Sequence, residues 1–532
     1  MFKRITAIIL CLIIIVFSFS GCFGRMKADE SFAVPILDEP TSLDPQIADS
    51  DAEKMIVLNC YEGLLRVNEN GELENGVAQS YSVSEDGLTY TFNLRHDAHW
   101  ALFSGHKSVL GEKYGEDYKN TFDITVYAED FEFAFDRVFD SAIASPYASV
   151  FECISSYEAV DRFTFRITLK YKYDGFLNTL TYAGAMPCDR EFFELTGGKY
   201  GLDAKYMLCN GAFNASRWTE GTSIRIVRND DYNGENKIMP ASVTFYINAS
   251  QSLVADKMNL NTYDVAFLNS SDYNSLGNKD DYNAVPVENT VYSLVFNQAN
   301  KYLENRNIRL AISHSVDSSL AQGISENIVE ATGLVPPFCK IGNESYDNIS
   351  GTKLLSYNAD AAKAYFDEGL SETGDSSVEI DFKCTAEYEQ FIKQLVQIMQ
   401  KNLGVKFVAS VTVLESSELD AAVADGNYAV VFYPFTAKSS NANEFLESFE
   451  NNSIFNYNSA EYSLLMSEMR ANSGDFSAMK NYCERAEELL LKDAVMLPVI
   501  FENSYFITGK DTGGIYFYSS QSNISFFKAV KK

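Results

Sequence analysis

Residues 84–95 of the chain read Ser-Glu-Asp-Gly-Leu-Thr-Tyr-Thr-Phe-Asn-Leu-Arg. The Asp86-Gly87 pair is a strong signal for a tight turn, because glycine tolerates the positive φ that such turns require. Apolar residues then alternate with polar ones from Leu88 to Leu94, which is the period of a strand with one buried face. The stretch therefore predicts a turn leading into a strand that packs one face on a core.

The same kinds of pattern recur along the rest of the chain. Apolar runs and alternations predict further strands at 163–169, 223–227, 243–247, 291–296 and 428–433. Helical spacing predicts helices at 128–139, 360–368, 388–403, 462–470 and 478–492. Asn358 is a possible cap, and Gly404 is a stop. Because strands and helices are mixed throughout, the pattern indicates an α/β or α+β fold.

The N-terminus has the layout of a secretory signal peptide. Lys3 and Arg4 form a short positive region, an apolar run covers 5–19, and Ser20-Gly21 precedes Cys22. The run is shorter than the roughly 20 residues of a spanning helix. The ending resembles a bacterial lipobox, which implies a signal peptide over 1–21, lipidation of Cys22 and a tether over 22–30. An uncleaved anchor is the alternative; both place the remaining chain outside the cytoplasmic membrane, and the lipidated form on its outer face.

The charge of the chain limits its partners. The formal net charge is −30, and it becomes −32 once Lys3 and Arg4 are removed. A surface of this sign repels nucleic acid and anionic headgroups, so we expect no nucleic-acid partner. Seven scattered cysteines remain beyond Cys11 and Cys22, which favours buried free thiols. A single Cys188–Cys209 bridge is the alternative.

Motifs of common enzyme classes are missing from the sequence. It contains no Gly-x-Ser-x-Gly turn, no Walker loop and no Gly-x-Gly-x-x-Gly. Pairs of carboxylates are no evidence for glycosidase chemistry, because 73 acidic residues bring many pairs together by chance. We therefore expect a protein that is not an enzyme and has no cofactor. An extracellular hydrolase on an unfamiliar fold is the alternative.

Histidines form one cluster in the sequence. His96, His99 and His106 fall within eleven residues and could bind zinc or nickel. His96 and His99 flank the end of a predicted strand, however, so their side chains need not converge. We expect solvated loop histidines and no metal site, and a metal or metal-chelate carrier is the alternative.

A series of short motifs, in order along nearly the whole chain, carries a family resemblance. They are Glu39–Pro45, Tyr61–Leu64, Gly76–Ser80, 84–95, Trp100, Ala128–Phe131, Ala144–Ser149, Asn210–Phe213, Trp218, Asn229, Asn297, Asn307–Ile312, Val316-Asp317, Phe445-Leu446, Ala486-Glu487 and Val495–Pro498. Together they resemble the family 5 solute-binding proteins of ABC importers, which include oligopeptide-, dipeptide- and nickel-binding proteins. An insertion between Ser104 and Tyr127 departs from the family and lengthens a loop that bears His106.

The resemblance implies an α/β periplasmic-binding-protein-like fold of the cluster C type, with two main lobes, a hinge and an extra third domain. Lobe I would comprise 31–60, 170–288 and 497–532, lobe II 61–169, and lobe III 289–496. The chain would cross the hinge near 289 and 497. The resemblance also implies a monomer that captures a peptide or peptide-like solute between lobes I and III and delivers it to an ABC permease. A sensor that feeds a signalling partner would have the same sequence features.

The resemblance further implies a set of ligand-contacting residues. They are Glu39, Pro40, Thr41, Asn210 and Phe213 from lobe I, with Phe432, Pro434, Phe435, Thr436 and Lys438 from lobe III. Gap-free counting from Phe445-Leu446 places Lys438 where peptide-binding members carry the Asp that holds the ligand's α-ammonium, and Phe432 where some carry an Arg. Two like unit charges about 4 Å apart repel by about 4 kcal/mol at an effective dielectric constant of 20, so this charge reversal disfavours a ligand with a free amine. We therefore expect that the usual anchoring of a free N-terminus is absent; a solvent-facing Lys438 is the alternative.

Overall fold

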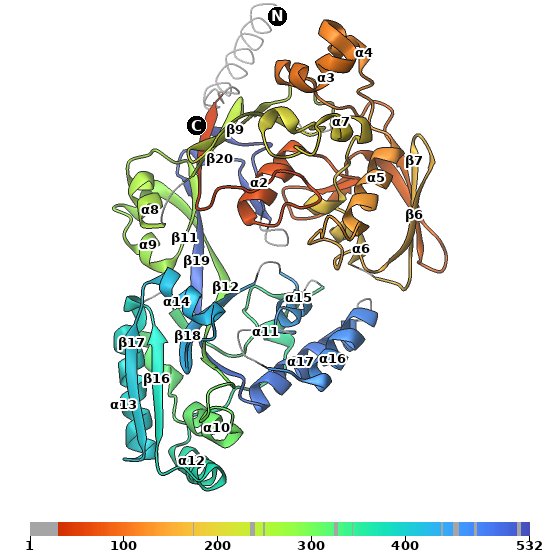
Figure 1. Ribbon diagram of the computed structural model, residues 1–532. Coiled ribbons are helices and arrows are strands. Elements are labelled where there is room, and N and C mark those ends of the chain that lie inside the picture. The colour runs from red at the N-terminus through yellow and green to blue at the C-terminus, as the bar shows by residue number, and fades with distance from the viewer. Residues whose placement is uncertain are drawn as a thin grey trace, which may run out of the picture.

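The computed structural model describes residues 30–531, apart from 174, 235–239, 248–250, 324–327, 343, 438–439, 451–456, 473–475 and 519–522. The expected signal peptide, Cys22 and the tether up to residue 29 lie outside the described residues. Figure 1 shows two bodies joined by two long strands, β12 (Tyr282–Phe296) and β19 (Met496–Gly509). We call the described residues of 30–281 and 510–531 the upper body, and those of 297–495 the lower body.

Two four-stranded sheets form the upper body. The first has the order β1 (Ser31–Ile36), β10 (Ser242–Ile247), β9 (Ser223–Arg228) and β8 (Phe213–Thr219). The second has the order β4 (Ala78–Val83), β5 (Thr89–Leu94), β7 (Thr164–Leu169) and β6 (Ile154–Asp161). The turn before β5 forms as predicted, with Gly87 at φ +73° and the Leu88 N–H donating to Asp86. Tyr90, Phe92 and Leu94 of β5 are buried.

Helices surround these two sheets. They are α2 (Asp51–Cys60), α3 (Lys107–Tyr114), α4 (Tyr118–Thr121), α5 (Ala128–Phe139), α6 (Phe176–Thr179) and α7 (Arg190–Leu195). Two further helices, α8 (Gln251–Asn259) and α9 (Ser270–Asn274), pack instead on β11 (Val265–Leu268) and β19 in a separate hydrophobic cluster. The helix predicted at 128–139 has the bounds of α5, and Phe131, Phe135 and Val138, which lie on one side of it, are buried. One continuous hydrophobic core serves both sheets of the upper body.

A seven-stranded sheet runs from the upper body into the lower one. Its order is β11 (Val265–Leu268), β19, β12, β18 (Val430–Thr436), β16 (Val378–Cys384) and β17 (Phe407–Val413), with β13 (Ile328–Glu330) on β19. The antiparallel register of β12 and β19 shifts between Val287 and Thr290 and again between Tyr292 and Ser293. These two strands therefore carry the chain across the junction in both directions.

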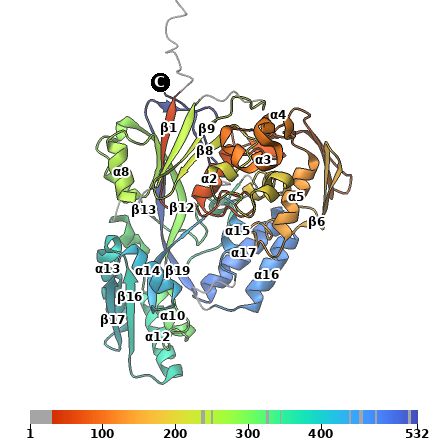
Figure 2. The same ribbon diagram turned by 45° about the horizontal axis from the view of Figure 1, so that its top comes forward.

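The lower body completes this sheet with helices on both sides. They are α10 (Arg306–His314), α11 (Tyr346–Ile349), α12 (Ala359–Thr373), α13 (Glu389–Leu403), α14 (Ser416–Ala424), α15 (Ala442–Glu447), α16 (Ala460–Ala471) and α17 (Phe476–Lys492). Two hydrophobic clusters form its core. Figure 2 shows α15, α16 and α17 beneath the part of the upper body that carries α5 and β6.

The predicted mixture of strands and helices is confirmed, and each predicted element overlaps an observed one. Asn358 caps α12 by accepting from the Ala361 N–H, and Gly404 ends α13 at φ +86°. The expectation for 104–127 is wrong in part, because this insertion folds into α3 and α4 rather than a loop. In the described part of the chain, no helix combines the length and apolar character needed to cross a bilayer.

Candidate ligand-binding site

Strand β18 has one side paired and the other largely open. It pairs with β12 along its whole length, from Val430 opposite Phe296 to Thr436 opposite Thr290. On the other side, β16 pairs only with Val430 and Val431. Among the described residues, 432–436 therefore have no strand partner on that side.

The backbone groups that face this open edge follow from the pairing pattern. The Ala437 N–H donates to the Asn289 carbonyl at 2.8 Å, and the Asn297 N–H donates to the Ala429 carbonyl at 3.0 Å. Backbone polar groups alternate between the two sides of a strand, so the odd-numbered residues of β18 face β12. Phe432, Pro434 and Thr436 therefore face the open edge, where proline's missing N–H removes no ladder bond. The parallel pairing of Lys383 with Val431 already uses the Phe432 N–H. The open edge therefore offers the Thr436 N–H and the carbonyls of these three residues to an extended ligand.

A cavity of about 500 Å³ lies between the two bodies, within the size range of small-molecule sites. Its upper wall comes from the turn before β6 and from the segment between β7 and α6. Its lower wall comes from α15, α16 and α17. In the chain, α15 is the element that follows β18, so the element after the open strand contributes to the cavity wall.

Side chains of the two bodies meet around this cavity. The Arg470 Nε of α16 lies 3.7 Å from the Glu152 Oε1 of the upper body, and the Arg470 Nη1 lies 3.0 Å from the Glu450 Oε2. Asn441 hydrogen-bonds the hydroxyl of Tyr182 across the same gap. Burial raises the pKa of the Glu447 carboxyl to about 7, although Arg470 nearby lowers it. The region is thus polar, partly dehydrated and shared between both bodies.

Glu39 and Thr41, two of the expected contact residues, are held by the upper body. Glu39 accepts from the Trp218 Nε1 at 3.1 Å and from the Gly221 N–H at 2.9 Å. The backbone N–H and the hydroxyl of Thr41 both donate to Glu53, which also caps α2. Pro40 between them is buried. These bonds fix the path of the chain after β1.

Three expected residues lie inside the fold. Asn210 is buried and exchanges hydrogen bonds with the backbone N–H and carbonyl of Glu62. Phe213 is fully buried in the upper core. The Phe432 ring is buried against Tyr292, Tyr388 and Phe391 of the lower core, so only its backbone faces the open edge.

The remaining expected residues lie at the open strand. Pro434 and Phe435 are half-buried, and Thr436 is exposed with its hydroxyl 2.9 Å from that of Thr290. Lys438 lies outside the described residues. The structure therefore brings Phe432, Pro434, Phe435 and Thr436 together on β18, and places Asn210 and Phe213 within the core of the other body.

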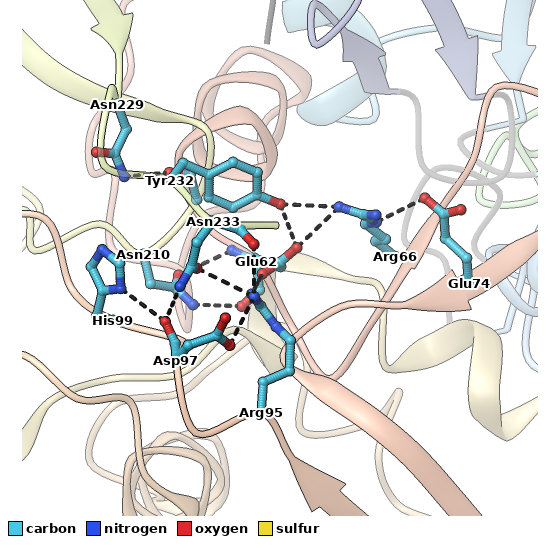
Figure 3. Close-up of polar contacts among 11 residues, drawn as sticks. Glu62, Arg66, Glu74, Arg95, Asp97, His99, Asn210, Asn229, Tyr232 and Asn233 are labelled. Carbon is cyan, nitrogen blue, oxygen red and sulfur yellow. Dashed lines mark hydrogen bonds and ion pairs between the residues drawn. The ribbon is translucent and has the colours of Figure 1, made fainter. Parts of the chain in front are cut away.

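A buried polar cluster centred on Glu62 fixes part of the upper body (Figure 3). Glu62 accepts from Arg66 at 3.1 Å, from Arg95 at 2.6 Å and from the hydroxyl of Tyr232. Arg66 also contacts Glu74 at 2.8 Å. Because protein groups occupy the carboxylate from several directions, this cluster connects segments of the fold and leaves little capacity for a ligand.

The three clustered histidines have separate partners. His96 stacks on Phe163, and the His99 Nδ1 lies 2.9 Å from the Asp97 carbonyl. His106 is buried between Phe103 and Phe192, contrary to the expectation of a solvated ring. The described residues contain no group of three or more His, Cys, Asp or Glu that could hold a metal. The seven cysteines at 60, 153, 188, 209, 339, 384 and 483 are buried and free, as expected.

Comparison with known proteins identifies the family. The model described as "Bacterial extracellular solute-binding proteins, family 5 Middle" matches residues 72–457. The chain belongs to family 5. This family 5 solute-binding protein is 23% identical to the dipeptide-binding protein DppE of Bacillus subtilis, over 90% of this chain and 88% of the relative. It is 24% identical to OppA, an oligopeptide-binding protein of the same organism, over 94% and 93%.

Solved structures confirm the expected periplasmic-binding-protein-like fold. A Listeria monocytogenes OppA bound to peptide matches this family 5 protein with a TM-score of 0.72 at 20% identity, covering 95% of this chain and 99% of the other. A Haemophilus influenzae OppA in complex with RPPGFSPFR matches with a TM-score of 0.72 at 20% identity, covering 95% and 100%. The sequence motifs thus led to the right family and fold.

The acidic cavity is the part of the candidate site that sequence reasoning missed. Its charged residues come from 152, 444, 447 and 470, which are widely separated in the chain. None of them stands out among 73 acidic and 43 basic residues. The sequence resemblance pointed instead to 434–439 as the ligand-holding segment, and within it to Lys438.

Proposed function

We propose that this family 5 protein is an extracytoplasmic receptor that captures a peptide or peptide-like solute between its bodies and delivers it to an ABC permease. The open edge of β18 carries the proposal. An extended peptide adds to a sheet edge through main-chain hydrogen bonds, which give affinity without requiring a particular sequence. Relatives named for binding dipeptides and oligopeptides support the same ligand class.

The proposed mechanism needs no covalent step. The two bodies would close on the solute by rotation at β12 and β19, burying most of the ligand surface. We keep the expected lobe boundaries as part of the proposal: 31–60, 170–288 and 497–532 for lobe I, 61–169 for lobe II, and 289–496 for lobe III. The crossing of β12 and β19 near 289 and 497 supports the two hinge points.

The open-edge model makes the Thr436 N–H a direct ligand contact. Thr436→Pro removes this donor and should weaken peptide binding by roughly 1 kcal/mol, or about fivefold. Thr436→Val is the matched control, because it removes the hydroxyl and keeps the N–H; its affinity should stay close to that of the wild type. Isothermal titration calorimetry with a tripeptide measures both. Equal losses in the two variants would exclude pairing at this edge.

Closure and N-terminal recognition have separate tests. Small-angle scattering should show a smaller radius of gyration when peptide is added, and an unchanged radius would count against a hinged receptor.

The Lys438 position leads us to propose that the ligand's free α-ammonium is not held in the usual way. A free and an N-acetylated peptide should then bind similarly, whereas a strong preference for the free amine would refute this point.

We also propose that the mature protein is a monomer that a diacylglycerol group on Cys22 holds at the outer face of the cell membrane. The N-terminal pattern of a short apolar run followed by Ser20-Gly21-Cys22 supports this anchor. Two acyl chains anchor a protein stably, whereas one is marginal. Cys22→Ser should move the protein from the membrane fraction to the soluble fraction of its host, and a membrane-bound variant would contradict lipidation.

A further inference from the structure

Three acidic and two aromatic side chains are among the twelve described residues that line the cavity between the bodies. Glu152 contributes from the upper body, and Glu444 and Glu447 contribute from α15. Among the described residues that line the cavity, Arg470 is the one basic residue. The described lining residues therefore have an excess of two formal negative charges, within a protein whose net charge is already −30.

Hydrogen bonds and ion pairs position the charged side chains of the cavity. Arg470 is shared between Glu152 at 3.7 Å and Glu450 at 3.0 Å, so its charge is offset partly by a residue outside the lining. The neighbours that hydrogen-bond the other two carboxylates include neutral amides. Asn441 donates to the Glu444 Oε1 at 2.6 Å, and Asn443 hydrogen-bonds Glu447. Neutral donors hold a carboxylate in position without cancelling its charge.

Burial makes this excess costly for the protein alone. The pKa of Glu447 rises to about 7, first because burial removes water from the carboxyl and also because Glu444 lies near it. A positive charge placed in the cavity would reduce this cost, since opposite charges within 4–6 Å favour the ionised form. Tyr171 and Tyr173 also line the cavity and offer ring surfaces to an aliphatic stem or a cation.

We infer that this cavity receives a cationic side chain, lysine- or arginine-like, from the peptide held at the open edge of β18. The inference rests on the proposed function, because β18 supplies the main-chain pairing and the connection 437–441 leads directly from β18 to α15. Side chains of an extended ligand alternate in direction, so one of them enters the cavity while the main chain stays paired. The volume of about 500 Å³ has room for a long basic side chain.

Three tripeptides that differ in the central residue test this inference: Ala-Lys-Ala, Ala-norleucine-Ala and Ala-Glu-Ala. Norleucine is the matched control, because it keeps most of the aliphatic stem and lacks the ammonium. Calorimetry with the wild-type protein should show the lysine peptide binding about tenfold or more tightly than the norleucine peptide, with the glutamate peptide weakest. Equal affinity for the lysine and norleucine peptides would overturn the inference and leave the proposed peptide receptor intact.

Variants of the cavity identify the groups responsible. The double variant Glu444→Gln with Glu447→Gln preserves shape and should reduce the lysine-to-norleucine ratio to near one while leaving norleucine-peptide affinity almost unchanged. Glu461→Gln on the exposed side of α16 is the control of equal charge change, and it should keep the wild-type ratio. A preserved ratio in the double variant would place the selectivity elsewhere and refute the inference.

Free cations distinguish the source of the positive charge. Spermidine and free lysine should bind far more weakly than the lysine peptide, because they lack the main chain that pairs with β18. Spermidine binding as tight as the peptide would show a receptor for small cations and would refute the peptide side-chain assignment. Failure of all three tripeptides to bind would refute the proposed function itself, and with it this inference.

Discussion

Arg137 of α5 and Asp44 of the segment after β1 form a bidentate ion pair in which both side chains are only 5% exposed. The Arg137 Nη1 lies 2.9 Å from the Asp44 Oδ1, and the guanidinium stacks over the Phe193 ring at 4.2 Å. The pair connects the segment that leaves the first sheet to the helix beside the second. The two sheets of the upper body are therefore held as one unit by charge as well as by their shared core.

Removing one member of this pair should be costly. Arg137→Met leaves Asp44 buried without its counter-ion and should lower the free energy of unfolding by about 3–5 kcal/mol. Arg166→Met is the control, because its pair with Glu158 is 40% and 57% exposed and should contribute less than about 1 kcal/mol. Urea titration followed by circular dichroism measures both. A similar small loss in the two variants would show that the buried pair contributes no more than a surface one.

Glu62 provides a second test of buried charge. Its carboxylate, 3% exposed, accepts from Arg66 and Arg95, so Glu62→Gln leaves two guanidinium groups short of a partner. We expect a loss of about 3 kcal/mol or more in the free energy of unfolding. Glu74→Gln removes only the more exposed partner of Arg66, and should cost less than about 1 kcal/mol. Equal unfolding midpoints for the two variants would contradict the central role given to Glu62.

His106 should make the protein sensitive to acid. Burial lowers its pKa from 6.5 to about 4, so the folded protein holds a neutral ring where the unfolded chain takes up a proton. The free energy of unfolding is unaffected by this difference above pH 6.5. It decreases as the pH falls toward 4, by a total of about 3 kcal/mol. His106→Gln keeps a donor for the Met207 carbonyl and has no proton to gain. The difference in stability between variant and wild type should therefore shift by about this amount between pH 7 and pH 4, and parallel curves would be the contrary result.

Binding of a lysine peptide should depend on the protonation of Glu447. Its pKa is raised to about 7 in the free protein, and a bound cation favours the ionised form. Affinity should accordingly fall by up to about tenfold from pH 8 to pH 6, with proton release on binding near pH 7. Glu152, Glu444 and Arg470 face the same cavity, so the norleucine peptide and Glu447→Gln serve as controls for their titration. Calorimetry in two buffers of different ionisation enthalpy detects the proton, and an identical slope in Glu447→Gln would assign it to another group.

The sequence predicted correctly those helix boundaries and buried faces that depend on residues close together in the chain. The stripe of α5, the Asn358 cap of α12 and the Gly404 stop of α13 depend on residues within a few positions of each other. The first half of β12 was missed, because Tyr282 to Asn289 contains Pro286 and few buried residues. That segment forms a strand through its pairing with β19, more than 200 residues away, and Pro286 fits there because β18 does not extend along it.

Tertiary contacts explain where the site expectations and the structure diverge. Asn210 has a polar side chain after a buried segment, which sequence alone does not distinguish from a ligand contact. Its amide is instead used to fix the backbone of Glu62. His106 is surrounded by Phe103 and Phe192, and Phe192 is remote in the sequence, so its burial has no local signature. The acidic cavity likewise exists only where α15 and α16 meet the upper body.

The register shift of β12 opposite β19 has a mechanical consequence. At Val287 and Thr290 the pairing moves from Ser504 to Glu502, so two residues of β12 lie opposite one residue of β19. Extra residues of this kind increase local twist and weaken the ladder at one point. A paired ribbon is stiff within its own plane and bends more readily across its face, so we expect β12 and β19 to bend most easily at this shift and at the second one between Tyr292 and Ser293. Because β18 is bonded to β12 from Thr290 onward, a bend at the first shift would move the open edge of β18 together with the lower body.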